Sequence, residues 1–83
     1  MNEKQIVTTI ARELSIRPAQ VSATAELLDG ANTIPFIARY RKEATGSLDE
    51  SQLRAVSERL AQLRALEERR AAVLARIEAL GQL

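Results

Sequence analysis

Apolar side chains recur at helical spacing near the start of the chain. Ile6, Ile10 and Leu14 stand four residues apart, so they share one face of a helix while the charged residues between them fall on other faces. Asn2 precedes them and is a suitable N-cap, because its side chain can accept a hydrogen bond from a backbone N–H of the first turn. We therefore predict a first helix over about residues 3–14.

Prolines and glycines bound the next two predicted helices. Pro18 and Pro35 each suit the first turn of a helix, where the missing N–H costs nothing. Gly30 and Gly46 follow them as C-terminal stops. The second helix accordingly runs from Pro18 to just before Gly30, and the third is short, running from Pro35 until about residues 43–44.

The remainder of the chain is predicted to form one long helix. Asp49 and Gln52 stand in the capping-box relation at its start, and up to Leu80 the sequence is rich in Ala, Leu, Arg and Glu, which are strong helix formers. At 1.5 Å per residue this helix reaches about 45 Å, which exceeds the width of a small helical domain. Its first half carries an apolar seam formed by Leu53, Val56, Leu60 and Leu63.

The apolar seam of the long helix does not continue into its second half. Glu67 and Arg70 interrupt it before Leu74 and Ile77 resume, whereas a two-stranded coiled coil normally keeps its seam over three or four heptads. We interpret the first half as the cover of the small domain, and we expect the second half to contact something that this chain lacks. A second apolar line, one heptad apart, consists of Leu66, Val73 and Leu80.

Together these elements predict an all-α fold, in which three short helices pack on the first half of one long C-terminal helix. Residues 1–83 form a single helical region, with the short helices in 1–48 and the long helix in 49–80. Because the long helix has too few partners within this length, we predict that the chain is a fragment of a larger protein. The predicted core consists of Ile6, Val7, Ile10, Leu14, Val21, Leu27, Leu28, Ile34, Phe36, Ile37, Leu53, Val56, Leu60 and Leu63.

Composition removes most catalytic chemistry. Twelve basic and eleven acidic side chains nearly cancel, so the overall charge does not favour nucleic acid as a partner. Cys and His are absent, which excludes disulfides and thiol chemistry and removes the commonest general base and metal ligand. No apolar run approaches the roughly 20 residues of a membrane span, and the N-terminus lacks the pattern of a secretory signal. We predict a cytoplasmic, non-enzymatic protein that uses no metal or cofactor and has no membrane partner.

The candidate chemistry is concentrated in the stretch NTIPFIARYRKEATGSLDE. It contains both aromatic side chains, Phe36 and Tyr40, and the basic run 39–42. Three cations beside an aromatic ring can contact phosphates and stack on a base. One alternative is a solvated helix face whose cations are favoured by the helix dipole. The other is pairing of Arg39 or Arg41 with carboxylates of the long helix or of a neighbouring domain.

Two groups of residues follow from this stretch and from the basic positions nearby. Pro35 and Gly46 are expected to bound the third helix, and Phe36 and Ile37 are expected to pack in the core. The residues with a predicted structural role are Pro35, Phe36, Ile37, Tyr40 and Gly46. The candidates for contact with nucleic acid or a partner are Arg12, Arg17, Arg39, Arg41 and Lys42.

Two strings of the chain resemble a known family. NTIPFIARYRKEATGSLDESQLR, followed by RLAQLRALEERRAAVLARIEALG, closely resembles the N-terminal helical region of the bacterial Tex family of transcription accessory proteins. The resemblance covers essentially the whole chain and is densest from Asn32 to Arg70. It implies a longer cytoplasmic protein with an RNase-H-like domain, a helix-hairpin-helix segment and a C-terminal S1 domain, to which the family's nucleic-acid binding is chiefly attributed. The resemblance implies no catalytic activity, and it assigns no nucleic-acid contact to a residue of this chain.

Three functional hypotheses remain. We favour a helical scaffold segment that positions the other domains of a Tex-like protein and touches the transcription machinery. The second hypothesis is a module that binds DNA or RNA directly through the basic run 39–42. The third is a homodimer built on the long helix. Salt-dependent binding would separate the second from the first, and a concentration-dependent mass would reveal the third.

Overall fold

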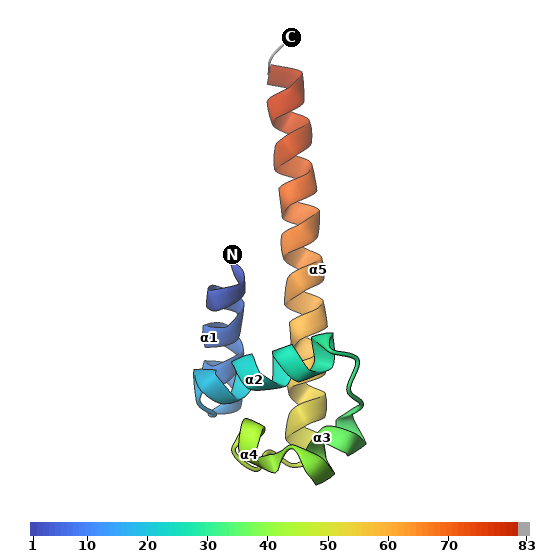
Figure 1. Cartoon of the computed structure of the whole chain (residues 1–83). Coiled ribbons are helices and arrows are strands. Elements are labelled where there is room, and N and C mark those ends of the chain that lie inside the picture. The colour runs from blue at the N-terminus through green and yellow to red at the C-terminus, as the bar shows by residue number, and fades with distance from the viewer. Residues whose placement is uncertain (82–83) are drawn as a thin grey trace.

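Helices make up most of residues 1–81, the part of the chain whose backbone the computed structural model describes; side chains are described as far as residue 77. This part shows no strand and contains five helices, and the molecule measures 55 × 24 × 16 Å (Figure 1). The predicted all-α fold with one long last helix is confirmed. In chain order the helices are α1 (Glu3–Leu14), α2 (Pro18–Asp29), α3 (Ile34–Tyr40), α4 (Lys42–Thr45) and α5 (Glu50–Gly81).

The helix starts are held by side chains, as the sequence predicts. Asn2 Oδ1 accepts a hydrogen bond from the Gln5 backbone N–H at 2.9 Å, and Gln5 Oε1 accepts one from the Asn2 N–H at 2.8 Å. The same reciprocal pair joins Asp49 and Gln52 at the start of α5, at 2.8 and 3.0 Å. Each pair satisfies two backbone donors that have no partner within the helix, so α1 and α5 begin where the sequence indicates.

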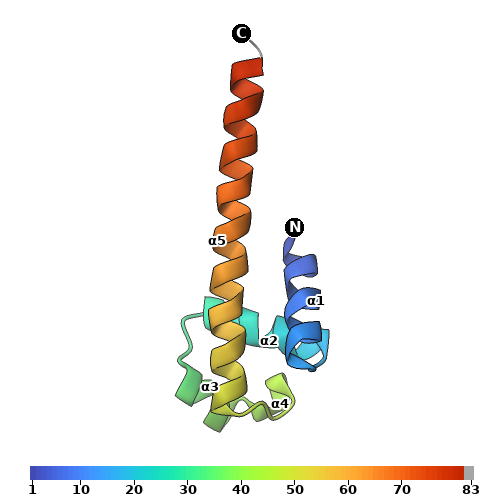
Figure 2. The ribbon, with the colours of Figure 1, turned by 180° about the vertical axis from the view of Figure 1, so that it is seen from behind.

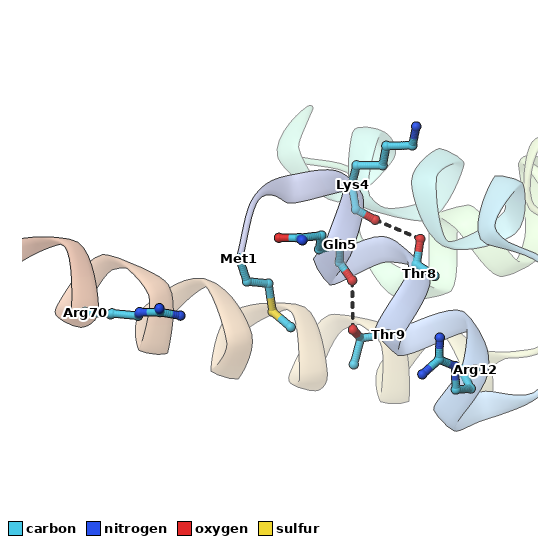
Figure 3. Close-up of a pocket in the computed structure, with 7 residues that line it drawn as sticks. All are labelled: Met1, Lys4, Gln5, Thr8, Thr9, Arg12 and Arg70. Atoms are coloured by element: carbon cyan, nitrogen blue, oxygen red, sulfur yellow. Dashed lines mark hydrogen bonds between the residues drawn. The ribbon is translucent and has the colours of Figure 1, made fainter.

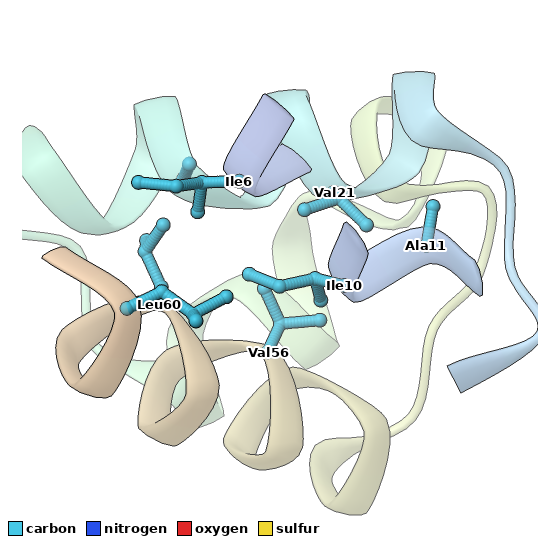
Figure 4. Close-up of a cluster of buried hydrophobic side chains, with 8 residues drawn as sticks. Ile6, Ile10, Ala11, Val21, Val56 and Leu60 are labelled. Atoms are coloured by element: carbon cyan, nitrogen blue, oxygen red, sulfur yellow. The ribbon is translucent and has the colours of Figure 1, made fainter. Parts of the chain in front are cut away.

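A first core cluster lies where α1 and α2 pack against the first half of α5 (Figure 4). Ile6 and Ile10 of α1 and Val21 of α2 meet Val56 and Leu60 of α5, and all five side chains are buried. The seam predicted for the first half of α5 is therefore the surface that covers the short helices. Burial of these side chains is the main stabilising contribution available to a domain of this size.

A second cluster fixes α3 and the loop after α4 to the start of α5. It is built from Ile37, Leu48 and Leu53. Leu48 is buried, although it stood outside the predicted core. The second cluster lies at the end of the molecule opposite the C-terminal end of α5 (Figure 1). The two clusters together account for the whole buried length of α5, which ends at Leu63.

The third predicted helix is in fact two helices. Arg41 leaves helical geometry, with φ −125° and ψ 38°, and separates α3 from α4. The prediction of one continuous helix up to residues 43–44 is therefore wrong. The bend turns α4 towards α2, so that Thr45 is completely buried and its carbonyl oxygen accepts a hydrogen bond from the Gln20 side chain at 3.0 Å. Packing against α2 has overridden the helix propensity of the sequence.

Phe36 is not a core residue, which corrects a second prediction. Its side chain is 43% exposed, whereas that of its neighbour Ile37 is fully buried. The helix α3 has only two turns, and a single side of it meets the core; Ile34, Ile37 and Ala38 occupy that side. Residue 36 lies on the opposite side of a helix from residues 34 and 38, so its side chain faces away from the core. The predicted packing role holds for Ile37 only.

Ion pairs join the flank of α5 to the short helices. Arg59 makes a two-pronged contact with Glu13 of α1, at 2.7 and 2.9 Å. Arg64 does the same with Asp29 of α2, at 2.8 and 3.0 Å, and also pairs with Glu3 of α1. Such planar two-pronged contacts fix orientation better than single ones. They hold α1 and α2 at a defined angle on α5.

These pairs predict a loss of stability in acid. Hydrogen bonds from Arg59 and Arg64 lower the pKa of Glu13 and of Asp29, respectively. A carboxyl whose folded-state pKa is lowered stabilises the fold above its ordinary pKa, and this contribution disappears as the pH falls through the folded-state value. We expect the melting temperature to fall as the pH is lowered below the ordinary pKa values of these carboxyls, which are 4.5 for Glu13 and 3.8 for Asp29. Arg64→Met should show a smaller drop than the parent, and Arg54→Met should match the parent; equal drops in all three would contradict this role.

Candidate interaction surfaces

The second half of α5 exposes a row of apolar side chains. We call Leu66, Val73, Leu74 and Ile77 the C-terminal stripe; they lie on one side of the helix and are between 48% and 62% exposed. Seen from behind, α5 extends well past α1 into a region with no neighbouring helix (Figure 2). The position expected to continue the line, Leu80, lies outside the described side chains. The stripe therefore has no covering element within residues 1–77.

A second exposed apolar surface lies on α3. The rings of Phe36 and Tyr40 lie 5.2 Å apart at an angle of 45°, and the Arg39 guanidinium lies over the Tyr40 ring at 5.3 Å. We call these three residues the aromatic patch. Their spacing follows from α3, because positions 36 and 40 are one helical turn apart. The patch sits at the end of the molecule away from the C-terminal stripe (Figure 1).

Four of the five candidate contact residues gather at this same end. Arg41 Nε donates to Glu43 Oε1 at 2.9 Å, so its charge is offset locally. Among the described residues Arg39 and Lys42 take part in no ion pair. Arg17, the residue before α2, reaches Gly46 so closely that a Cβ there would lie 2.9 Å from its guanidinium. Pairing of Arg39 or Arg41 with carboxylates of the long helix is not observed in the described residues.

The fifth candidate, Arg12, lies apart from the others. It lines an open cleft between α1 and α5 together with Lys4 and Arg70 (Figure 3). The floor of the cleft contains Thr8 and Thr9, whose hydroxyls donate to backbone carbonyls of the preceding turn at 2.9 and 2.8 Å. The cations project from the cleft without converging on one point. The predicted contact residues therefore do not form a single site.

Comparison with known proteins assigns the family. The family model described as Tex-like protein N-terminal domain matches residues 4–78. The chain belongs to this family. Transcriptional accessory protein Tex of Neisseria gonorrhoeae is 56% identical over 78 residues, which cover 94% of this chain and 10% of that protein. Protein YhgF of Escherichia coli is 58% identical over 74 residues, which cover 89% of this chain and 10% of that protein.

Similarity extends beyond bacteria. S1 RNA-binding domain-containing protein 1 of Homo sapiens is 33% identical over 78 residues, covering 94% of this chain and 8% of that protein. This Tex-like domain thus spans about a tenth of the length of the curated relatives it matches. The resemblance found in the sequence is confirmed. Among the helices that the structure describes, none combines the length and apolarity needed to cross a membrane.

Arg59 and Arg64 are the polar residues of this Tex-like domain that sequence reasoning missed. Each stands next to a buried residue of the α5 seam, Leu60 or Leu63. That adjacency is the signal that could have found them, because an arginine at the edge of an apolar seam reaches the neighbouring helix with its guanidinium. Their roles are structural, since their ion pairs join α5 to α1 and α2.

Proposed function

We propose that this Tex-like domain is a helical scaffold at the N-terminal end of a longer, non-enzymatic transcription accessory protein of the cytoplasm. It positions the other domains of that protein, and nucleic acid is contacted by those domains. The observation that carries the proposal is the C-terminal stripe: four large apolar side chains on a helix that continues past its own bundle. Exposed apolar patches of this kind typically mark a surface that another element covers.

The lengths of the relatives indicate what covers the stripe. The matched segment is about a tenth of each bacterial relative, so a protein of that length has ample chain to pack on α5. The human relative carries an S1 RNA-binding domain in its name, and the segment matched here is only 8% of it. These observations favour later domains of the same chain as the occupant of the stripe, and they favour nucleic-acid contact outside this domain.

Hydrogen exchange tests the scaffold proposal directly. The amides of residues 64–77 should exchange far more slowly in a full-length Tex-like protein than in the 83-residue chain, because docked helices open only with the domain that covers them. Amides of the buried segment 53–60 serve as the internal control and should be protected in both. Equal, fast exchange of 64–77 in both proteins would contradict the proposal. Protection that rises with the concentration of the 83-residue chain would instead support a homodimer.

A triple substitution gives the matching mutational test. Replacing Leu66, Val73 and Ile77 by serine should leave the melting temperature of the isolated chain almost unchanged, because these side chains are between 48% and 62% exposed. The same change in the full-length protein should expose its interdomain segments to protease. Leu60→Ser is the matched control on the same helix; it buries a hydroxyl in the core and should unfold the isolated chain. A triple variant as unstable as Leu60→Ser would show that the stripe already has a partner.

Direct nucleic-acid binding is the competing function, and it makes an opposite prediction. If the basic run is not a binding site, labelled duplex and single strands should bind only weakly and without sequence preference. Three to five phosphate contacts give a salt slope of about −3 to −4.5 on duplex DNA, so this binding should vanish near physiological salt. Sequence-dependent binding that survives there, and is abolished by Gln at Arg39, Arg41 and Lys42 with the fold intact, would favour the binding module.

A further inference from the structure

Both aromatic side chains of the protein lie outside its core. The sequence contains one Phe, one Tyr and no Trp, and Phe36 and Tyr40 are 43% and 58% exposed. A buried aromatic side chain contributes about 150–250 Å² of burial. A domain this small is expected to use such residues for folding. Their placement on the surface therefore indicates a role in contact with another molecule.

The aromatic patch is ordered before anything binds it. The ring centroids of Phe36 and Tyr40 lie 5.2 Å apart, and the Arg39 guanidinium lies over one face of the Tyr40 ring. Their helix is anchored by Ile37, which is fully buried, and by Thr33, whose hydroxyl accepts the Phe36 backbone N–H at 3.3 Å. Side chains that hold one another on a fixed helix lose little conformational entropy on binding, which raises the affinity that a given contact area provides.

Charge around the patch defines its partner. Arg39 and Lys42 have no carboxylate partner among the described residues, whereas Arg41 is paired with Glu43. The patch therefore combines two rings with the cation of Arg39, and a second cation, Lys42, follows two residues after Tyr40. Protein interfaces have this anatomy, with aromatic and Arg residues at the centre and polar groups around it. The complementary surface carries an apolar side chain flanked by carboxylates.

We propose that the aromatic patch is a docking site for an acidic protein segment. An aliphatic or aromatic side chain of that segment packs on Phe36 and Tyr40, while flanking Asp or Glu residues pair with Arg39 and Lys42. The planes of the two rings are tilted by 45° to each other, and the Arg39 guanidinium lies over one face of the Tyr40 ring. This arrangement disfavours a single-stranded nucleic acid, whose bases need open ring faces for stacking and more cations for their phosphates.

The patch is independent of the scaffold surface. It lies at one end of a molecule 55 Å long, while the C-terminal stripe lies towards the other end. A domain docked on the stripe need not cover α3, so occupation of one surface does not by itself exclude occupation of the other. Failure of the acidic-segment proposal therefore leaves the scaffold proposal standing, and the reverse also holds.

The single tyrosine gives a clean experiment on the 83-residue chain. Tyr40 fluorescence is recorded during titration with a short Tyr-free peptide in which leucine alternates with aspartate and glutamate. We expect saturable binding with a Kd below about 1 mM. Phe36→Ala and Arg39→Gln should each weaken it by about tenfold or more, as expected at the centre of an interface. The matched control Arg54→Gln, an exposed cation on α5, should leave it unchanged.

Control ligands decide between the outcomes. A peptide with serine in place of leucine, and one with lysine in place of the acids, should each bind at least about tenfold more weakly. An equal response to either would overturn the proposal, as would no response to the acidic peptide up to about 1 mM. If oligothymidylate binds more tightly than the acidic peptide at physiological salt, the proposal is overturned in favour of nucleic acid. Circular dichroism checks each variant, and if Phe36→Ala does not fold, Arg39→Gln decides, because it leaves both rings in place.

Discussion

Replacing Ile37 by alanine is expected to destabilise the domain by about 2–5 kcal/mol, the usual cost of truncating a fully buried aliphatic side chain. Ile37 holds α3 against Leu48 and Leu53, and these three residues are the whole buried part of the second cluster. Domains of this size have a total stability of about 5–15 kcal/mol, so the variant loses a large share of it. Urea unfolding followed by circular dichroism measures the effect as a lower midpoint.

Phe36→Ala is the matched control on the same helix. It removes a larger side chain, yet that side chain is half-exposed and faces away from the core. We expect a cost of about 1 kcal/mol or less, close to that of other surface substitutions. The order of the two effects is the test, because side-chain size alone predicts the reverse. A midpoint lowered more by Phe36→Ala than by Ile37→Ala would mean that the ring is part of the core in solution.

Gly46→Ala is expected to destabilise the domain by about 1–3 kcal/mol. Gly46 ends α4 with φ +66°, a left-handed conformation that costs an L-residue roughly 1–2 kcal/mol. An added Cβ would also lie 2.6 Å from the Gln20 amide nitrogen. That nitrogen donates to the Thr45 carbonyl at 3.0 Å and ties α4 to α2. Displacing it loses a hydrogen bond that typically contributes about 1 kcal/mol.

Gly30→Ala separates these effects from the general consequence of losing a glycine. Gly30 ends α2 with φ −80°, which any residue adopts, and an added Cβ would meet its nearest neighbour at an ordinary 3.4 Å. The stability of the Gly30→Ala variant should differ little from that of the parent, because the lower entropy of its unfolded chain offsets any crowding in the folded state. Thermal melts of the two variants beside the parent make the comparison. Equal melting temperatures for Gly46→Ala and Gly30→Ala would contradict the strain argument.

Local rules predicted the helix boundaries well, because caps and breakers act over a few residues. Asn2 and Asp49 form the capping boxes that their positions suggest, and α2 begins at Pro18. The seam of α5 was also predicted, since its spacing leaves only one apolar face. These features need no knowledge of how the helices meet.

Features that depend on the meeting of distant segments were missed. The break at Arg41 follows from packing of α4 on α2, and no breaker residue announces it in the sequence. Phe36 was assigned to the core on hydrophobicity, although the two-turn α3 has room for only one buried side. Of the candidate contact residues, Arg12 proved to lie apart from the other four. Adjacency in sequence does not give the tertiary position of a side chain.

The projecting half of α5 makes the domain a lever. From the last buried residue, Leu63, to Gly81 the helix extends about 27 Å. A rotation of only about 10° at the bundle therefore moves the far end by about 5 Å, if the helix stays straight. Arg59 and Arg64 lie where α5 leaves the bundle, and their ion pairs join α5 to Glu13, Asp29 and Glu3. Losing one of these ion pairs would thus change the direction of the projecting helix more than the stability of the bundle. A domain docked on the far end of the helix would be displaced by the same distance as that end.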